Sequence, residues 1–209
     1  MAVIKGIKAA VVVASGTSTT FTAEATTANV AKTVYTITDR SKRFWDASAA
    51  TTVYYNGIAN TSYASIQYPG GIVTWAVSPG SSAVTVTGKY LAAAASAQAR
   101  DWSMDVSYDM ADATVFGNTA RVQVPILRGA TITVNQFYAD DTFQALVRAG
   151  SLVGWQLYVN YDSGTPANDV YYIGYGYIAG GVSAAVDGLE EEPITITVTD
   201  GPYFVSGVA

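Results

Sequence analysis

The sequence predicts a mainly β protein, an antiparallel β-sandwich or barrel with one short flanking helix. Threonine, valine, tyrosine and glycine are abundant, whereas lysine, glutamate and leucine are scarce, and this composition favours strands over helices. Several segments alternate apolar and polar residues with a period of two, and turn signals separate them at intervals of roughly eight to twelve residues. The 209 residues are enough to bury a sizeable core.

The first half of the chain predicts a compact β-rich module. Asn56-Gly57 and Pro69-Gly70-Gly71 are strong turn signals, because asparagine and glycine tolerate positive φ angles. A further turn is expected at 15–20. Strands are expected at 7–14, 33–38, 51–55, 63–68, 72–77 and 84–91. We therefore expect an N-terminal module over residues 1–95, partly packed on a second β-sandwich over 96–209, with the seam in the alanine-rich stretch 92–99.

The clearest strand of the second half is 100–110. Its even positions, including Trp102, Met104, Val106 and Tyr108, are apolar and are expected to pack against the core. Its odd positions are polar and acidic: Asp101, Ser103, Asp105, Ser107 and Asp109. The strands expected at 121–137 and 193–200 repeat this division with Thr131, Thr133, Asn135, Thr195, Thr197 and Thr199. The pattern predicts a polar sheet face of short side chains, with few of the lysines that usually protect exposed sheets.

One short amphipathic helix is expected at 140–149. Two aspartates begin it, apolar residues recur at helical spacing within it, and Gly150 follows it. Further strands are expected at 152–161, 171–178 and 182–186. The tail 201–209 shows no pattern and is expected to be an arm or a frayed end.

The residue inventory excludes most catalytic chemistry. The chain has no cysteine and no histidine, which removes thiolate zinc sites, disulfides and imidazole catalysis. Asp101 and Asp105 would lie about 13 Å apart on one strand, too far for a retaining glycosidase pair. Gly174 and Gly176 lack a following helix, so they are interpreted as strand glycines beside packed aromatics and not as a phosphate loop. We expect no enzyme activity, no cofactor and no metal.

Charge is divided unevenly along the chain. Residues 1–99 carry a net charge of +4 and residues 100–209 a net charge of −9. An acidic second half disfavours a grip on nucleic acid phosphates but suits a surface that repels them. The apolar run at 9–14 is short for a signal peptide, and no run approaches the ~20 residues of a membrane helix. We therefore expect a soluble protein made in the cytoplasm that does not insert into membranes.

The order and spacing of several stretches resemble the major tail tube proteins of long-tailed bacteriophages of the non-contractile type. The stretches cover most of residues 30–200. They are KTVYTITDRSKRFWD, TVYYNG, YPGGIVTW and VTVTGKYL in the first half, and DWSMDVSYDM, DATVFG, ADDTFQALVRAG and SAAVDGLEEEPITITVTD in the second.

This resemblance implies a β-sandwich with a flanking helix that assembles into hexameric rings stacked as a hollow tube of the virion tail. The 96–209 domain would form the tube, and its polar face would line an acidic conduit for DNA delivery. The implied partners are further copies of the chain, a tape-measure protein inside the tube, tail terminator and tail tip proteins, and passing DNA. A capsid decoration protein or a fibre-type adhesin is the alternative.

Two groups of residues are candidates for contacts between subunits. One belongs to an expected surface turn and the other to an acidic cluster that could pair with a neighbouring chain. A cation site in the acidic cluster is the less favoured interpretation. The candidates are Lys42, Arg43, Trp45, Asp187, Glu190, Glu191 and Glu192.

Overall fold

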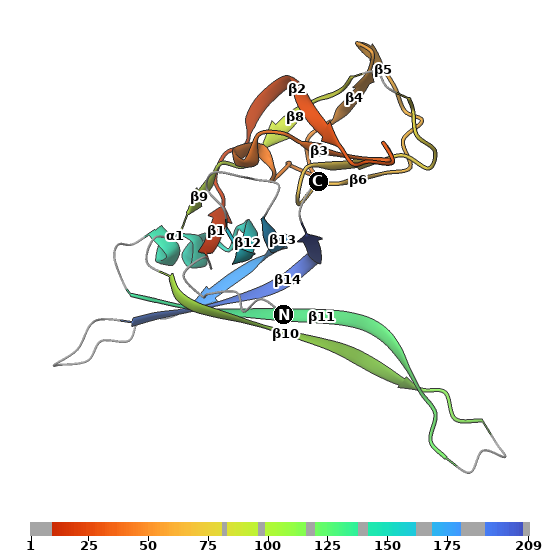
Figure 1. Ribbon diagram of the computed structural model, residues 1–209. Coiled ribbons are helices and arrows are strands. Elements are labelled where there is room, and N and C mark those ends of the chain that lie inside the picture. Colours follow the sequence, from red (N-terminus) through yellow and green to blue (C-terminus); the bar gives the residue numbers. More distant parts are fainter. Residues whose placement is uncertain are drawn as a thin grey trace.

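The computed structural model describes residues 10–80, 83–95, 99–115, 120–137, 142–161, 169–180 and 191–206. Two antiparallel seven-stranded sheets make up most of it, and one of them curls into a half-barrel (Figure 1). A single short α-helix accompanies the sheets within the described residues. The predicted mainly β fold class is confirmed.

The half-barrel sheet contains the strands of the C-terminal half together with two short strands from the N-terminal half. All neighbouring strands in it are antiparallel. Across the sheet, the order is β10 (Ala99–Asp112), β11 (Gln123–Phe137), β14 (Glu191–Ser206), β13 (Val170–Gly180), β12 (Leu152–Asn160), β1 (Ala10–Ala14) and β9 (Ala93–Ala95).

The second sheet belongs to residues 15–92, which we call the inserted module. Its strand order is β5 (Ile58–Ala59), β4 (Thr52–Tyr55), β8 (Val84–Tyr90), β2 (Thr19–Ala28), β3 (Val34–Ile37), β7 (Ile72–Thr74) and β6 (Ser65–Gln67). The chain leaves the half-barrel sheet from β1 and returns to it through β9, and Ala14 pairs with Ala93. The boundary expected at residue 95 therefore does not separate the two sheets, since β1 and β9 both belong to the half-barrel sheet.

Several local predictions are confirmed and two are wrong. Asn56 and Gly57 both have positive φ, and Gly70 and Gly71 connect β6 to β7 as expected. The turn expected at 15–20 is predicted too long, because β2 already begins at Thr19. The many threonines of β2 hide the alternation of buried and exposed positions that would have indicated a strand. The tail expected to be irregular from residue 201 instead continues β14 to Ser206, because it pairs with β13.

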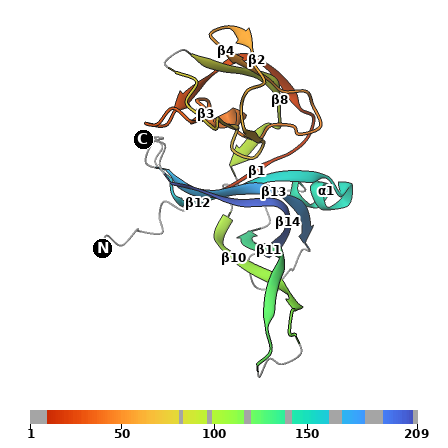
Figure 2. The ribbon, with the colours of Figure 1, turned by 90° about the vertical axis from the view of Figure 1, so that its right-hand side faces the viewer.

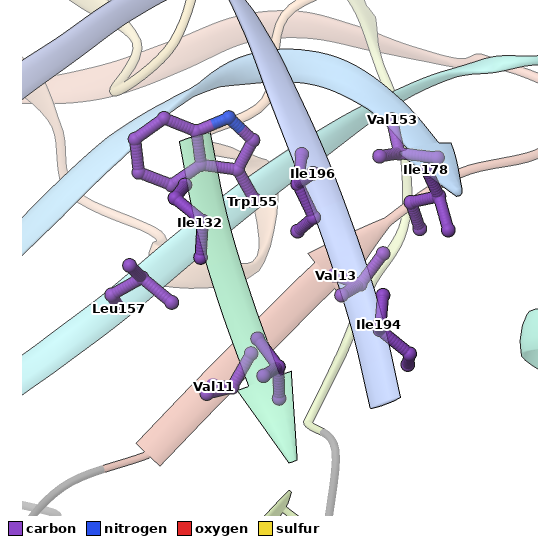
Figure 3. Close-up of a cluster of buried hydrophobic side chains, with 10 residues drawn as sticks. Val11, Val13, Ile132, Val153, Trp155, Leu157, Ile178, Ile194 and Ile196 are labelled. Carbon is purple, nitrogen blue, oxygen red and sulfur yellow. The ribbon is translucent and has the colours of Figure 1, made fainter. Parts of the chain in front are cut away.

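Inside the curl lies the core of the half-barrel (Figure 3). Opposite walls contribute to it: β1 and β12 on one side, and β11 and β14 on the other. The buried members are Val11, Val13, Ile132, Val134, Val153, Trp155, Leu157, Ile178, Ile194 and Ile196. Burial of these aliphatic side chains and of the Trp155 ring supplies the hydrophobic stabilisation that keeps the sheet curled.

The helix α1 (Thr142–Ala149) packs against this core through Leu146 and Val147. Gly150 ends it with a φ of +56°, and its N–H donates to the carbonyl oxygens of Leu146 and Val147. This is the glycine C-cap that the sequence predicts, so the expected helix at 140–149 is confirmed for the residues that the structure describes.

Candidate functional surface

The eleven residues that the sequence assigns to a polar face share the outer side of β10, β11 and β14, and we call them the polar face. Nine of them lie on the half-barrel sheet, and Ser107 and Asp109 continue along the same side of β10 into the hairpin that projects from it. Residues opposite one another in neighbouring antiparallel strands project from the same side of a sheet. The register of β10, β11 and β14 therefore places side chains in rows. The rows are Asp101–Asn135, Ser103–Thr133–Thr195 and Asp105–Thr131–Thr197.

All members of the polar face are solvent-accessible in the single chain. The three aspartates are exposed, and Thr133 and Thr195 are half-buried. The Asn135 side-chain amide donates to the Asp101 carboxylate at 2.6 Å, which restrains both side chains at one end of the face. The Thr199 hydroxyl donates to the Tyr175 carbonyl oxygen at 3.3 Å.

The chemistry of the polar face is that of a smooth, negatively charged wall. Its members are aspartate, serine, threonine and asparagine, with no cation among them. Because the side chains are short, few atoms project far from the sheet. The carboxylates repel phosphate groups that approach it. No cluster of three or more metal-ligating side chains occurs among the described residues, so these carboxylates do not converge on a shared cation.

The other half of the same outer face has a different character. The row of Asp105, Thr131 and Thr197 continues across the sheet to Tyr177 and Leu152. Beyond these two residues the outer face becomes aromatic and buried, with Tyr158, Tyr171, Ile173 and Tyr175 in a common cluster with Phe44 of the inserted module. The module therefore covers one half of the face and leaves the polar half bare.

The curl turns the two halves of the outer face in different directions. The inserted module lies against β12 and β13, while β10 and β11 pass on the far side of the half-barrel (Figure 1). The same arrangement is seen after a 90° rotation (Figure 2). The core of the half-barrel thus separates the polar face from the module.

The contact between module and half-barrel, which we call the seam, is specific. Phe44 is fully buried and lies over Gly154, where any Cβ atom would collide with its ring. The hydroxyl of Tyr175 donates to the carbonyl oxygen of Trp45. Burial raises the pKa of Tyr175, so this hydroxyl remains protonated and available as a donor.

Charged groups also cross the seam. The Arg43 guanidinium donates to the Tyr171 hydroxyl at 2.9 Å and lies 5.3 Å from the centre of that ring. Arg40 forms an ion pair with Asp169 at 2.9 Å, and Asp169 is only 1% exposed. Arg43, Tyr171 and Asp169 are buried and Arg40 is partly buried, so these contacts are sensitive to the loss of either partner.

The structure corrects the contact predicted for the turn around residue 43. Arg43 is 5% exposed and Trp45 is fully buried, so both serve the interior of the subunit and neither is an exposed contact for another chain. Lys42 pairs with Glu24 at 2.6 Å. The sequence did not indicate this, because a basic-aromatic turn has the same composition whether it is covered or exposed.

The acidic cluster is only partly described. Asp187 and Glu190 lie outside the described residues. Glu191 and Glu192 begin β14 and pair with Phe137 and Gln136 of β11. The strand expected at 182–186 likewise lies outside the described part of the chain.

A projecting hairpin is the feature that sequence reasoning missed. Residues 106–115 and 120–130 extend away from the half-barrel as a two-stranded ribbon, which we call the arm (Figure 2). Val106, Tyr108 and Met110 were expected to continue the buried face of Trp102 and Met104. They are instead 41%, 55% and 49% exposed, because β10 extends beyond the core that the curl encloses.

An open groove lies at the base of the inserted module. Its volume is about 600 Å³. It is lined by Gly16, Ser18, Trp45, Asp46, Ala47, Ser48, Leu91, Leu152 and Tyr175, and so by both the module and the half-barrel sheet. The Asp46 carboxylate accepts hydrogen bonds from the Ser48 hydroxyl and backbone N–H at 2.6 and 2.9 Å. The Ser48 hydroxyl, followed by that of Ser18, lowers the pKa of Asp46.

No protein-family model matches the chain, and no curated protein matches it significantly. Among the described residues, no helix is long and apolar enough to cross a membrane.

Proposed function

We propose that this chain is the structural subunit of a phage tail tube, in which stacked hexameric rings enclose a conduit for DNA. The observation that supports the proposal best is the polar face. Residues from three adjacent strands form one bare, acidic surface of short side chains, turned away from the module. The family resemblance in the sequence points to the same function.

The proposed mechanism is electrostatic. Each subunit would contribute the polar face of β10, β11 and β14 to the inner wall of the ring. DNA carries a dense line of negative phosphates, so an acidic wall without lysine or arginine gives the backbone nothing to bind. The aspartates would reduce friction by repulsion, and the hydroxyl groups would keep the wall hydrated.

The strand edges of the half-barrel sheet also support assembly. β10 is an outermost strand of that sheet, and one side of its backbone has no strand partner within the described chain. Such an edge invites pairing with another chain, and closure into a ring removes it. In the proposed tube the inserted module would face outward, because it lies on the far side of the half-barrel from the polar face.

Electron microscopy of the purified protein tests the assembly. We expect six-fold rings or tubes on the order of 100 Å wide, the size of six small domains around a pore. Trimers, or monomers that persist at high concentration, would contradict the proposal and favour the decoration or adhesin alternative.

A charge reversal tests the conduit itself. Replacing Asp101, Asp105 and Asp109 together with lysine should leave tubes intact but slow DNA ejection, because the wall would then attract phosphates. A matched variant with serine at the same positions removes the charge without reversing it, and we expect a smaller defect. Normal ejection by the lysine variant would show that this face does not line the channel.

A further inference from the structure

Among the described residues, the arm has no third strand beside it, and its base is tied to the half-barrel by the Arg128 side chain, which donates to the Pro202 carbonyl oxygen at 3.3 Å. β11 pairs with β14 only from Thr131 onward, so beyond the pair of Val106 and Ala130 the two strands of the arm pair only with each other. An isolated two-stranded ribbon is marginally stable in water. Both of its outer edges present backbone groups without a strand partner among the described residues.

The arm is also unusually apolar for an exposed hairpin. Val106, Tyr108 and Met110 share one face of β10 and are each about half exposed. The other face of the ribbon carries Val122 and Val124, which are 40% and 45% exposed, because Val124 pairs with Ala111. Contiguous exposed apolar surface marks an interaction site far more often than isolated residues do. A standard interface takes roughly 20–30 residues from each partner, and the arm reaches the lower end of that range.

The groove at the base of the module has complementary chemistry. Leu91 and Leu152 contribute apolar side chains to its lining, and Ser18, Asp46 and Ser48 contribute polar ones. Its volume of about 600 Å³ lies within the range of roughly 300–1,000 Å³ that proteins use for ligands, enough for a few side chains. Tyrosine suits such a site, since its ring is apolar and its hydroxyl can donate to a carboxylate.

The arm cannot fill the groove of its own subunit. The groove lies beside the inserted module, whereas the arm projects from the opposite side of the half-barrel in both views (Figures 1 and 2). We infer that the arm of one copy docks in the groove of a second copy, with Tyr108 and Met110 entering between Leu91 and Leu152. This contact is heterologous, so it leads to closed rings or to open stacks. This inference depends on the proposed function only because both require that copies of the chain assemble with one another.

Cross-linking tests this contact directly, because the chain contains no cysteine. Met110→Cys in one preparation and Ala47→Cys in another place one thiol on the arm and one in the groove. Under oxidation, the mixture should form a covalent dimer between the two variants. Met110→Cys mixed with Val30→Cys is the control, since Val30 is 91% exposed on the module but does not line the groove. Equal cross-linking of both pairs, or of neither, would overturn the inference.

A complementation experiment tests the direction of docking. Tyr108→Ser with Met110→Ser disables the arm but keeps the groove, and Ala47→Trp fills the groove but keeps the arm. Each variant alone should fail to assemble, and an equimolar mixture should stop at a one-to-one dimer in analytical ultracentrifugation. Val30→Ser with Val77→Ser is the matched control, because it removes two exposed aliphatic side chains elsewhere and should assemble normally.

The outcomes separate this inference from the proposed function. Wild-type assembly by Ala47→Trp would refute docking in the groove. Rings that form without any link between positions 110 and 47 would refute the contact and leave the conduit proposal standing, whereas a wild-type chain that never assembles would refute both. If circular dichroism shows that a serine or tryptophan variant is unfolded, the cysteine pair decides the question.

Discussion

The outer face of the half-barrel sheet is covered on one half and bare on the other. On β12 and β13 it carries Tyr158, Tyr171, Ile173 and Tyr175, which the inserted module buries. On β10, β11 and β14 it carries the polar face, which is solvent-accessible among the described residues. The backbone is continuous between the halves, since Thr197 pairs with Tyr177. Side-chain chemistry therefore decides which half a β module can bury.

The inserted module protects the aromatic half of the outer face from water. Its removal would expose a row of aromatic residues, and a sheet with such a face aggregates. The bare half needs no cover in water, because every side chain on it can be hydrated.

Phe44→Ala should be the most destabilising truncation of a side chain at the seam. Phe44 is fully buried against Gly154, and removal of a buried phenylalanine ring costs about 3–5 kcal/mol of unfolding free energy. Urea denaturation followed by tryptophan fluorescence measures this value. Phe204→Ala is the control, because Phe204 is 57% exposed and should lose far less. Similar losses at both sites would show that the module does not depend on this contact.

Asp169→Asn should be the next most damaging change. It removes the buried partner of Arg40, and loss of one member of a buried ion pair costs about 3–5 kcal/mol when the other is buried as well. Arg40 is 21% exposed, so we expect about 2–3 kcal/mol. Thermal denaturation measures the change. Asp112→Asn removes the exposed pair with Arg121 and should leave the midpoint unchanged; an equal shift would contradict a special role for burial.

Asp105→Lys on the bare half should change stability by less than about 0.5 kcal/mol, because the residue is exposed and has room for a longer side chain. The same replacement at Ile173, on the covered half, should prevent folding, since it buries an uncompensated charge. Denaturation curves of the two purified variants make the comparison. A large loss from Asp105→Lys would mean that the polar face is covered within the subunit.

The smallest expected effect concerns acid stability. The Ser48 hydroxyl, and then that of Ser18, lower the pKa of Asp46 below its ordinary value of 3.8. A lowered folded-state pKa gives stability that is present above pH 3.8 and is lost as the pH falls through the folded value. Asp46→Asn should therefore reduce stability at neutral pH and weaken its decline between about pH 4 and pH 3. An unchanged acid profile would mean that these hydrogen bonds do not persist in solution.

Much of the fold was predictable from local patterns. The division of β10 into aspartates and apolar residues, the turn at Asn56-Gly57 and the helix ended by Gly150 are all set by neighbours in the sequence, and the structure confirms each. The members of the polar face were predictable for the same reason, since alternation alone places them on one side of a strand. Their role as a conduit wall remains a proposal.

Other features were not predictable, because they depend on where the core ends. Tyr108 continues the alternation of Trp102 and Met104, yet only the latter two lie above the enclosed core. Arg43 and Trp45 form a turn that resembles any polar surface turn until Tyr171 and Tyr175 are brought against it. Alternation indicates which face of a strand a residue occupies, but it does not indicate what lies opposite.

The sequence by itself determined the strands, the turns and the chemistry of each face, because these follow from backbone preferences and from a period of two. Only the tertiary structure decided which faces are covered. The curl of the half-barrel, the insertion between β1 and β9 and the length of the arm result from pairings between residues far apart in the chain, and such pairings leave no local pattern. These pairings bury the aromatic half of the outer face and leave the aspartates of the polar face in water.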